Sequence, residues 1–212
     1  LAVVMTPLEA AAILIVPSIV TNIWQMTVGG ALTRLGARLW PMMLAVCAGT
    51  WAGGGLMAPA NARISTLLLG VALVIYAAMG LRSVPLTVPS AHERPVGVVV
   101  GALTGIVTAA TGVFVLPAVP FLQTIGLEKE ELVQALGLAF TVSTLALAVN
   151  VGRALGAASF LSAPAVAALA AAGLGMAAGQ ALRRTLSPAT FRTCFFVGLL
   201  ALGLYLVIRS LG

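Results

Sequence analysis

Charge is scarce in this chain. Asp, Glu, Lys and Arg together make up 8% of its 212 residues, whereas hydrophobic residues make up 61%. A soluble domain carries roughly a quarter charged residues, so this chain cannot cover a water-exposed surface. The composition excludes a soluble globular protein and predicts an integral membrane protein. The net charge of +6 is spread singly or in pairs, whereas a nucleic-acid-binding protein clusters its basic residues, so we expect no nucleic-acid partner.

Residues that carry catalysis or bind metals are also rare. The sequence has one His and two Cys, and it contains none of the short motifs that bind zinc or the phosphates of ATP. An intramembrane enzyme would need a His, Asp or Lys inside a span, and none is expected there. We therefore predict no catalytic residue, no metal, no cofactor and no enzymatic activity.

Aromatic residues make up only 6% of the sequence, and most apolar residues are Leu, Val, Ala and Ile in long runs. These runs predict helices and exclude a β-barrel, whose strands are short and alternate. About 20 apolar residues cross a bilayer as a helix. The fold class is therefore an all-α integral membrane protein that crosses the membrane several times. The predicted spans are about residues 8–28, 38–58, 62–82, 130–150, 160–182 and 190–209.

The segment 95–124 is also apolar, but Thr, Gly and Pro residues interrupt it. A break in a membrane helix frees backbone N–H and C=O groups, which are tolerated only inside protein or beside a wet cavity. A broken apolar segment is therefore the best pointer to the substrate site of a transporter. The segment can cross the membrane once as a broken helix. It can also enter and leave on one side, as a re-entrant hairpin of two half-helices of about 13 residues, each too short to cross.

The basic residues favour the hairpin. With a single crossing, the two sides of the membrane hold 6 and 5 basic residues, which is no bias; with a hairpin they hold 8 and 3. Cytoplasmic loops carry an excess of Lys and Arg, so the hairpin gives a normal orientation with the basic side in the cytoplasm. The predicted location is the plasma (inner) membrane.

The two halves of the chain are similar at an offset of 123 residues, at which Ser18 pairs with Thr141 and Thr21 with Thr144. This similarity predicts two pseudo-symmetric repeats, and three full spans in each would make the repeats inverted. The first repeat lacks a counterpart of the broken segment, which predicts that roughly 30 to 35 residues are missing from its start. The predicted units are a first repeat over 1–83, a connecting loop over 84–94 and a second repeat over 95–212, which begins with the broken helix 95–124.

The break in this segment supplies the first group of candidate binding residues. We expect the second half-helix to begin near Thr111 and Gly112, so that its unpaired N–H groups and the positive end of its dipole attract an anion. The alternative is a packing motif of small residues between helices. The substrate-binding candidates here are Thr104, Gly105, Thr108, Thr111 and Gly112.

Polar residues on two helices related by the repeat form a second group. Ser18 and Asn22 are spaced to share one helical face, and so are Thr141 and Thr144. We predict that these neutral hydrogen-bonding groups contact substrate. The alternative is hydrogen bonding between helices.

Two further features have competing interpretations. Glu9, near the start of the first span, is either part of a helix cap or a proton-coupling carboxylate. Gly49 and Gly53 have the spacing of closely packed helices, and their partner is either another helix of the chain or a second copy in a homodimer.

The motif Gly101-Ala102-Leu103-Thr104-Gly105, followed by Gly112, Pro117 and a polar stripe in the next helix, resembles the sulfite exporter TauE/SafE family. Members of that family typically have a glycine cluster and a proline at this place, and a second copy of the motif near the N-terminus. The similar pattern covers nearly the whole chain. This chain departs from the family where Ala110-Thr111-Gly112 replaces three consecutive glycines, so that a Thr hydroxyl would substitute there.

The resemblance implies a secondary transporter that exports a small sulfur-containing anion, sulfite or an organosulfonate, by alternating access. Its expected partners are that anion and membrane lipids. The alternatives are a carrier for an unrelated small solute and a membrane scaffold subunit that transports nothing.

Overall fold

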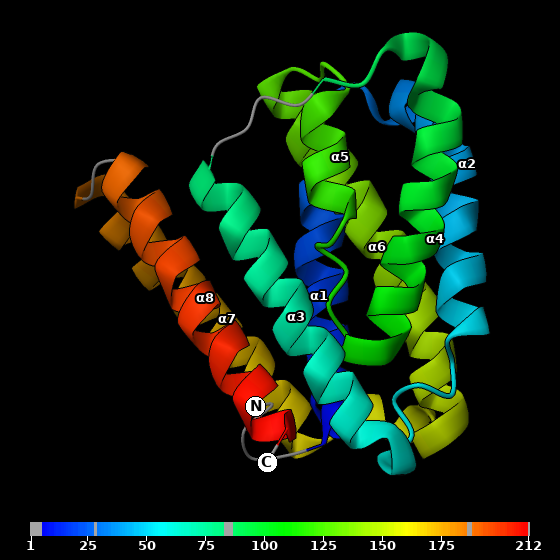
Figure 1. Ribbon diagram of the computed structural model, residues 1–212, viewed down its shortest axis with the longest axis vertical. Coiled ribbons are helices and arrows are strands. Elements are labelled where there is room, and N and C mark those ends of the chain that lie inside the picture. The colour runs from blue at the N-terminus through cyan, green and yellow to red at the C-terminus, as the bar shows by residue number, and fades with distance from the viewer. Residues whose placement is uncertain (1–5, 28, 83–86, 186–187, 212) are drawn as a thin grey trace.

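A computed structural model of the chain describes residues 6–27, 29–82, 87–185 and 188–211 (Figure 1). Its described part contains helices and no strand, which confirms the all-α prediction. Short 3-10 helices at 59–61, 90–92 and 157–161 precede α3, α4 and α7. The α-helices are α1 (Pro7–Thr27), α2 (Leu32–Ala52), α3 (Ala62–Arg82), α4 (Glu93–Thr111), α5 (Ala118–Thr124), α6 (Lys129–Leu155), α7 (Ala163–Thr185) and α8 (Pro188–Leu211).

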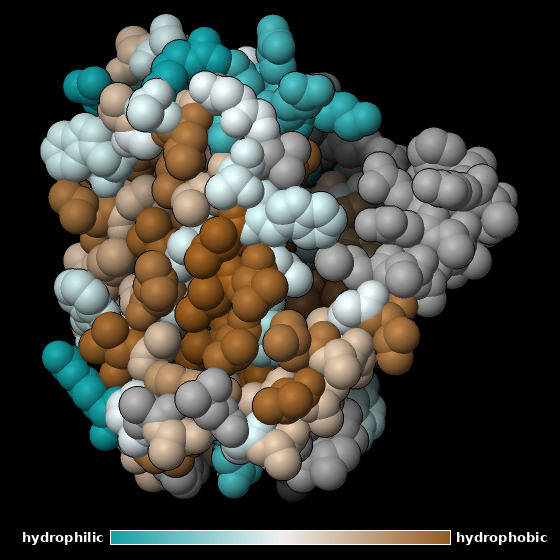
Figure 2. All heavy atoms as spheres, turned by 180° about the vertical axis from the view of Figure 1, so that it is seen from behind, coloured by the Kyte–Doolittle hydropathy of each residue, from teal (hydrophilic) through white to brown (hydrophobic). Residues whose placement is uncertain are grey.

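Five helices are long and apolar enough to cross a membrane, judged by length and composition: α1, α3, α4, α6 and α8. Large apolar side chains such as Val99, Leu145 and Ile208 are exposed on the outside of the molecule. Figure 2 shows a hydrophobic region between hydrophilic ends on the face that it presents. This surface suits contact with lipid, which confirms the prediction of a membrane protein.

The predicted spans differ from the helices by three residues or more in three places, one of which is the end of α6 at Leu155 instead of residue 150. α2 covers 32–52 instead of 38–58, because the glycine run that starts at Gly53 ends the helix. The sequence estimate ran through these glycines into the apolar residues after them. α7 is the smaller correction, since it covers 163–185 rather than 160–182.

α4 and α5 form a hairpin, as the re-entrant alternative predicts. In Figure 1, α4 descends from one end of the molecule and the chain climbs back through α5 to the same end. Arg38 of α2 joins the two ends of the hairpin. Its guanidinium group pairs with the Glu93 carboxylate at the start of α4, at 2.6 and 2.7 Å, and donates to the carbonyl of Ile125, just after α5, at 2.8 Å. The two ends of the segment therefore lie at the same end of the molecule.

The two arms of the hairpin are unequal, which corrects the prediction of two similar half-helices. α4 has 19 residues and is about 28 Å long at 1.5 Å per residue, enough to cross on its own. The return arm is the loop 113–117 and α5, which has 7 residues. Residues 113–115 of the loop lie outside any turn or helix, and 116–117 form a turn. The loop and α5 together carry the chain back along α4, at roughly 3.3 Å per extended residue and 1.5 Å per helical residue. Pro117 lacks the N–H that a continuous helix would need at this point.

Replacing Arg38 by Met should destabilise the hairpin, because it leaves the largely buried Glu93 carboxylate and the Ile125 carbonyl without their donor. We expect a loss of about 1–3 kcal/mol in unfolding free energy, measured as a lower Tm of the purified protein in detergent. Arg34→Met is the matched control: Arg34 also pairs with a Glu, but its side chain is 69% exposed, and exposed pairs contribute less than about 1 kcal/mol. Equal Tm values for the two variants would contradict this role of Arg38.

α2 and α4 run parallel and contact each other along a seam of glycines. A Cβ added at Gly105 would fall on the carbonyl oxygen of Val46, and one added at Gly49 would fall on that of Ala102. Small residues allow two membrane helices to approach this closely. The prediction of close packing within the chain is therefore confirmed. α4 covers the face that carries Gly49 and Gly53, and a homodimer stays a prediction.

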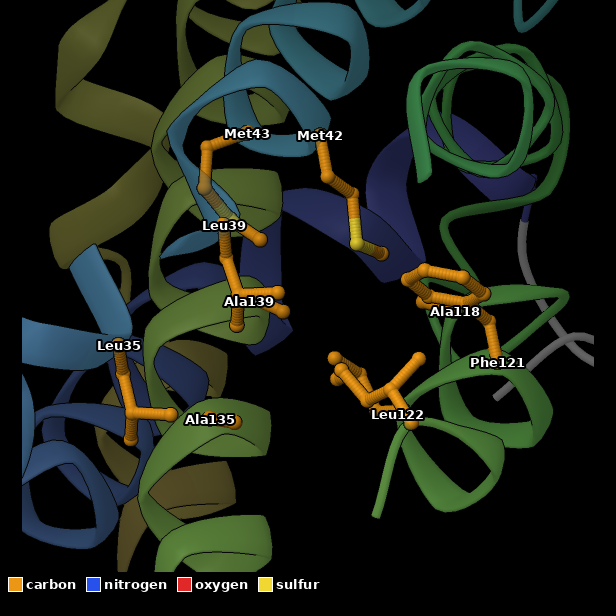
Figure 3. Packing of buried hydrophobic residues seen from close by; sticks show 10 residues of the cluster. Leu35, Leu39, Met42, Met43, Ala118, Phe121, Leu122, Ala135 and Ala139 are labelled. Atoms are coloured by element: carbon orange, nitrogen blue, oxygen red, sulfur yellow. The ribbon is translucent and has the colours of Figure 1, made fainter. Parts of the chain in front are cut away.

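The largest core cluster lies between α2, α5 and α6 (Figure 3). Leu39 and Met42 of α2 belong to it, together with Phe121 and Leu122 of α5 and Ala139 of α6, and all five are buried. A helix of seven residues is not stable alone. This packing therefore holds α5 in place.

Gln134 of α6 connects the end of α1 to the start of α2. Its side-chain nitrogen donates to the carbonyls of Met26 and Gly29, at 2.8 and 3.2 Å, and its oxygen accepts from the N–H of Ala31 at 3.0 Å. The side chain is buried. Gln134 therefore supplies partners to backbone groups that helix ends leave unpaired.

Candidate functional site

A cavity of about 250 Å³ lies between α1, α3, α6 and the turn that ends α4. On a comparable measure a single water needs only about 10–15 Å³, so the cavity has room for a small ligand. Its side-chain polar groups are the hydroxyls of Ser18, Thr111 and Thr144, and the remaining side chains are apolar. The lining residues are Ala10, Ala11, Leu14, Ile15, Ser18, Leu69, Thr111, Gly112, Val113, Phe114, Thr144 and Leu147.

Ser18 and Thr144 lie near the midpoints of α1 and α6. The Ser18 hydroxyl makes no hydrogen bond to the described part of the chain. Pro17 precedes it inside α1 and lacks the N–H that would otherwise reach the carbonyl of Ile13. The Asn22 side chain donates to the Thr144 hydroxyl at 3.3 Å, across the contact between α1 and α6. Thr144 therefore reaches the cavity and also joins the two helices.

The helix end at Thr111 and Gly112 differs from the prediction. Gly112 is the residue that ends α4, with a φ of 73°, and its N–H donates to the carbonyl of Thr108 at 2.8 Å. The next helix begins only at Ala118. The prediction of a helix start was wrong because a glycine in the left-handed conformation ends a helix. The negative end of a helix dipole, rather than the positive end, therefore lies beside the cavity.

Five of the substrate-binding candidates lie outside the cavity lining: Asn22, which donates to Thr144, and four others. Gly105 packs against the α2 backbone, where a Cβ would lie 2.6 Å from the Thr50 nitrogen. The hydroxyls of Thr108 and Thr141 donate to carbonyls one turn earlier in their own helices, both at 2.7 Å. The hydroxyl of Thr104 is buried and has no partner among the described residues. The structure therefore brings together, of the predicted residues, Ser18, Thr111, Gly112 and Thr144, with Asn22 as their neighbour.

The loop after α4 contains unused hydrogen-bond donors. The N–H of Val113 donates to the Thr111 hydroxyl at 3.1 Å. In the described part of the chain, the N–H groups of Phe114, Val115 and Leu116 donate no hydrogen bond. Val113 and Phe114 line the cavity. Unpaired backbone inside a membrane protein is tolerated where it lines a cavity, so the Phe114 N–H is a candidate donor to a ligand.

Glu9 lies at the exposed start of α1, outside the cavity lining. Its carboxylate accepts from the N–H and the hydroxyl of Thr6, at 3.0 and 2.9 Å, while the Thr6 hydroxyl accepts from the Glu9 N–H at 3.3 Å. This reciprocal pattern is a capping box. The helix-cap interpretation therefore describes Glu9 in this structure, and its role in proton coupling stays a prediction.

The comparison with known families covers nearly the whole chain. The model of the family described as Sulfite exporter TauE/SafE matches residues 1–206. The chain belongs to this family. No curated protein and no solved structure matches the chain. TauE/SafE membership and the apolar helices together make it a membrane protein of a transporter family, and they indicate an exporter of sulfite or another anion.

The sequence did not identify most of the lining of the cavity in this TauE/SafE protein. Ala10 and Ala11 line it with small side chains, and Leu69 contributes from α3. Phe114 also lines it, and its ring centroid lies 4.9 Å from that of Phe140 on α6. Apolar residues of these types occur throughout membrane helices, so no local signal distinguishes them. Only the tertiary packing does.

Proposed function

We propose that this protein is a secondary transporter that exports a small sulfur-containing anion, sulfite or an organosulfonate, through alternating access to the cavity beside α4. The observation that carries the proposal is an interrupted helical hairpin whose turn lines a largely apolar cavity with three hydroxyl groups, near the middle of two spans. Transporters place their substrates at such interruptions. Membership of the TauE/SafE family supports the choice of sulfur oxyanions.

The donors for an anion come from neutral groups. The Ser18 hydroxyl and the Phe114 N–H have no acceptor in the described structure, and the hydroxyls of Thr111 and Thr144 can rotate toward a ligand. No cationic side chain is among the described residues that line the cavity. An anion would therefore be bound by these neutral donors, which must outweigh the negative end of the α4 dipole, and it would be released without breaking an ion pair. Its exit from an inside-negative cell gains about 2.3 kcal/mol per charge per 100 mV.

We also propose that the two halves are inverted repeats in the inner membrane. α1 packs antiparallel to α6, and α3 antiparallel to α8, as two helices related by an axis in the membrane plane would. The contact of α2 with α6 has a counterpart in that of α1 with α7. The hairpin end carries Arg34, Arg38 and Arg94, and the positive-inside rule makes that end cytoplasmic.

Ligand-dependent stabilisation tests this function in the full-length protein. Sulfite, thiosulfate, taurine and sulfoacetate would each be added to the purified protein, with chloride at equal ionic strength as the control. A ligand at 100 times its Kd stabilises the folded state by about 2.7 kcal/mol, so a transporter of these anions should show a higher Tm with at least one of them. The stabilising anion should then leave proteoliposomes that contain the protein. No stabilisation and no efflux with any of the four would favour an unrelated solute or a scaffold.

A further inference from the structure

Two of the three hydroxyl groups that line the cavity, those of Thr111 and Thr144, present lone pairs to it rather than protons. The Thr111 hydroxyl donates its proton to the carbonyl of Val107, and the Thr144 hydroxyl donates to that of Phe140, both at 2.7 Å. Both residues line the cavity. A hydroxyl has one proton and two lone pairs, so in this orientation each oxygen accepts from, or coordinates, a ligand. One lone pair of each oxygen is already used, by the Val113 N–H at Thr111 and by the Asn22 side chain at Thr144, which leaves one lone pair for a ligand.

The end of α4 adds further oxygens of the same kind. Its last carbonyls, those of Ala109, Ala110 and Thr111, accept no hydrogen bond within the described chain, because the N–H of Gly112 reaches Thr108 and that of Val113 reaches the Thr111 hydroxyl. These carbonyls form the negative end of the helix dipole. Thr111 and Gly112, where α4 ends, line the cavity.

Formal charge is missing from the same place. None of the described residues that line the cavity is Asp, Glu, His, Lys or Arg, and the described chain contains no group of three or more His, Cys, Asp or Glu residues placed so that it could hold a metal ion. A divalent cation usually needs carboxylates, and a coupled proton needs a group that titrates. Neutral hydroxyl and carbonyl oxygens instead suit a monovalent metal cation, and broken membrane helices use their C-terminal ends for this purpose.

We propose that the cavity binds Na⁺ through the hydroxyl oxygens of Thr111 and Thr144 and the free carbonyl of Thr111, the one free carbonyl of the described α4 end whose residue lines the cavity. This inference rests on the proposed function, in which Na⁺ is the coupling ion. Na⁺ that enters the cell down its gradient would occupy the cavity on the return step, after the anion has left. The same hydroxyls would rotate between the two steps, from donors toward the anion to acceptors toward the cation.

Equilibrium binding of radioactive Na⁺ to the full-length purified protein tests the proposal, with choline chloride keeping the ionic strength constant and no sulfite present. The wild type should bind Na⁺ saturably. Thr111→Val and Thr144→Val should each weaken Na⁺ binding about tenfold, because each removes one of the oxygens that coordinate the charged ion. Thr50→Val is the matched control, because Thr50 is also buried and donates to a carbonyl one turn earlier, Val46, at 2.8 Å, but lies outside the cavity lining.

Absence of saturable Na⁺ binding by the wild type would overturn the proposal. So would an equal loss of binding in Thr50→Val and Thr144→Val while their Tm values stay close to that of the wild type. Sulfite binding, measured separately in choline chloride, keeps the two proposals apart. If sulfite binds and Na⁺ does not, only the cation site is wrong; if Na⁺ binds and none of the sulfur anions does, the proposed substrate is wrong.

Discussion

Gly105→Ala is expected to prevent α2 and α4 from packing. The added Cβ would fall on the Val46 carbonyl oxygen and lie 2.6 Å from the Thr50 nitrogen, and both are backbone atoms that cannot rotate away. The two helices would have to separate along the whole seam, because Gly101 and Gly49 make similarly close contacts with the facing backbone. We expect the unfolding free energy to fall by at least about 3 kcal/mol, which is the upper end of the range for overpacked cores. This would be seen as loss of the folded, monodisperse protein in detergent.

Gly36→Ala is the matched control for this variant. Gly36 also lies within α2, but nothing lies within 4 Å of the position that its Cβ would take. Alanine is favoured over glycine in a helix by about 0.5–1 kcal/mol, so this variant should be as stable as the wild type or slightly more stable. If Gly105→Ala keeps the wild-type Tm, the backbone of α4 does not lie against α2 as described.

Ser18→Trp is expected to abolish anion transport while the protein still folds. Ser18 lines the cavity, and an indole there would fill most of the space between α1, α6 and the end of α4. If the cavity is the substrate site, sulfite efflux from proteoliposomes should fall at least about tenfold, the change produced by roughly 1.4 kcal/mol of lost binding. The Tm should change little, because the cavity is open space rather than packed core.

Val20→Trp is the control for this substitution. Val20 lies two residues further along α1 and is 52% exposed on the outside of the molecule, where an aromatic residue meets lipid. This variant should transport like the wild type. Equal efflux by Ser18→Trp and Val20→Trp would show that the substrate takes another route.

The general architecture could be predicted from the sequence because it depends on composition and charge. Low charge excluded a soluble fold, and the distribution of Arg and Lys favoured a hairpin. The ion pair of Arg38 with Glu93 and the bond to Ile125 join the two ends of that hairpin, and its re-entrant path through the membrane stays a prediction. The lengths of the two arms could not be predicted. α4 continues through Thr104 and Thr108. The Thr108 hydroxyl donates to a carbonyl of its own helix, and the Thr104 side chain is buried in the packing. A Thr residue is compatible with both a continuous helix and a break, so the sequence does not decide between them.

The candidate site was predicted in part, for a similar reason. Ser18 and Thr144 reach the cavity because they lie near the middle of two spans that face each other. Gly105 does not reach the cavity and packs against α2 instead. Glycine serves both for backbone approach to a ligand and for close packing of helices, and the sequence does not distinguish these two uses. The same ambiguity affected Gly112, which ends one helix instead of starting another. Whether the positive or the negative end of a helix dipole lies beside the cavity depends on whether a helix starts or ends at Gly112. The sign of the electrostatic potential there could therefore not be predicted from the sequence.

Binding of ³⁵S-labelled sulfite to the full-length protein, compared between Ser18→Trp and Val20→Trp, tests most directly whether the cavity beside α4 is the substrate site. Saturable binding by the wild type and by Val20→Trp, together with its loss in Ser18→Trp at an unchanged Tm, is the result that we predict. Sulfite binding of equal affinity in Ser18→Trp would contradict it.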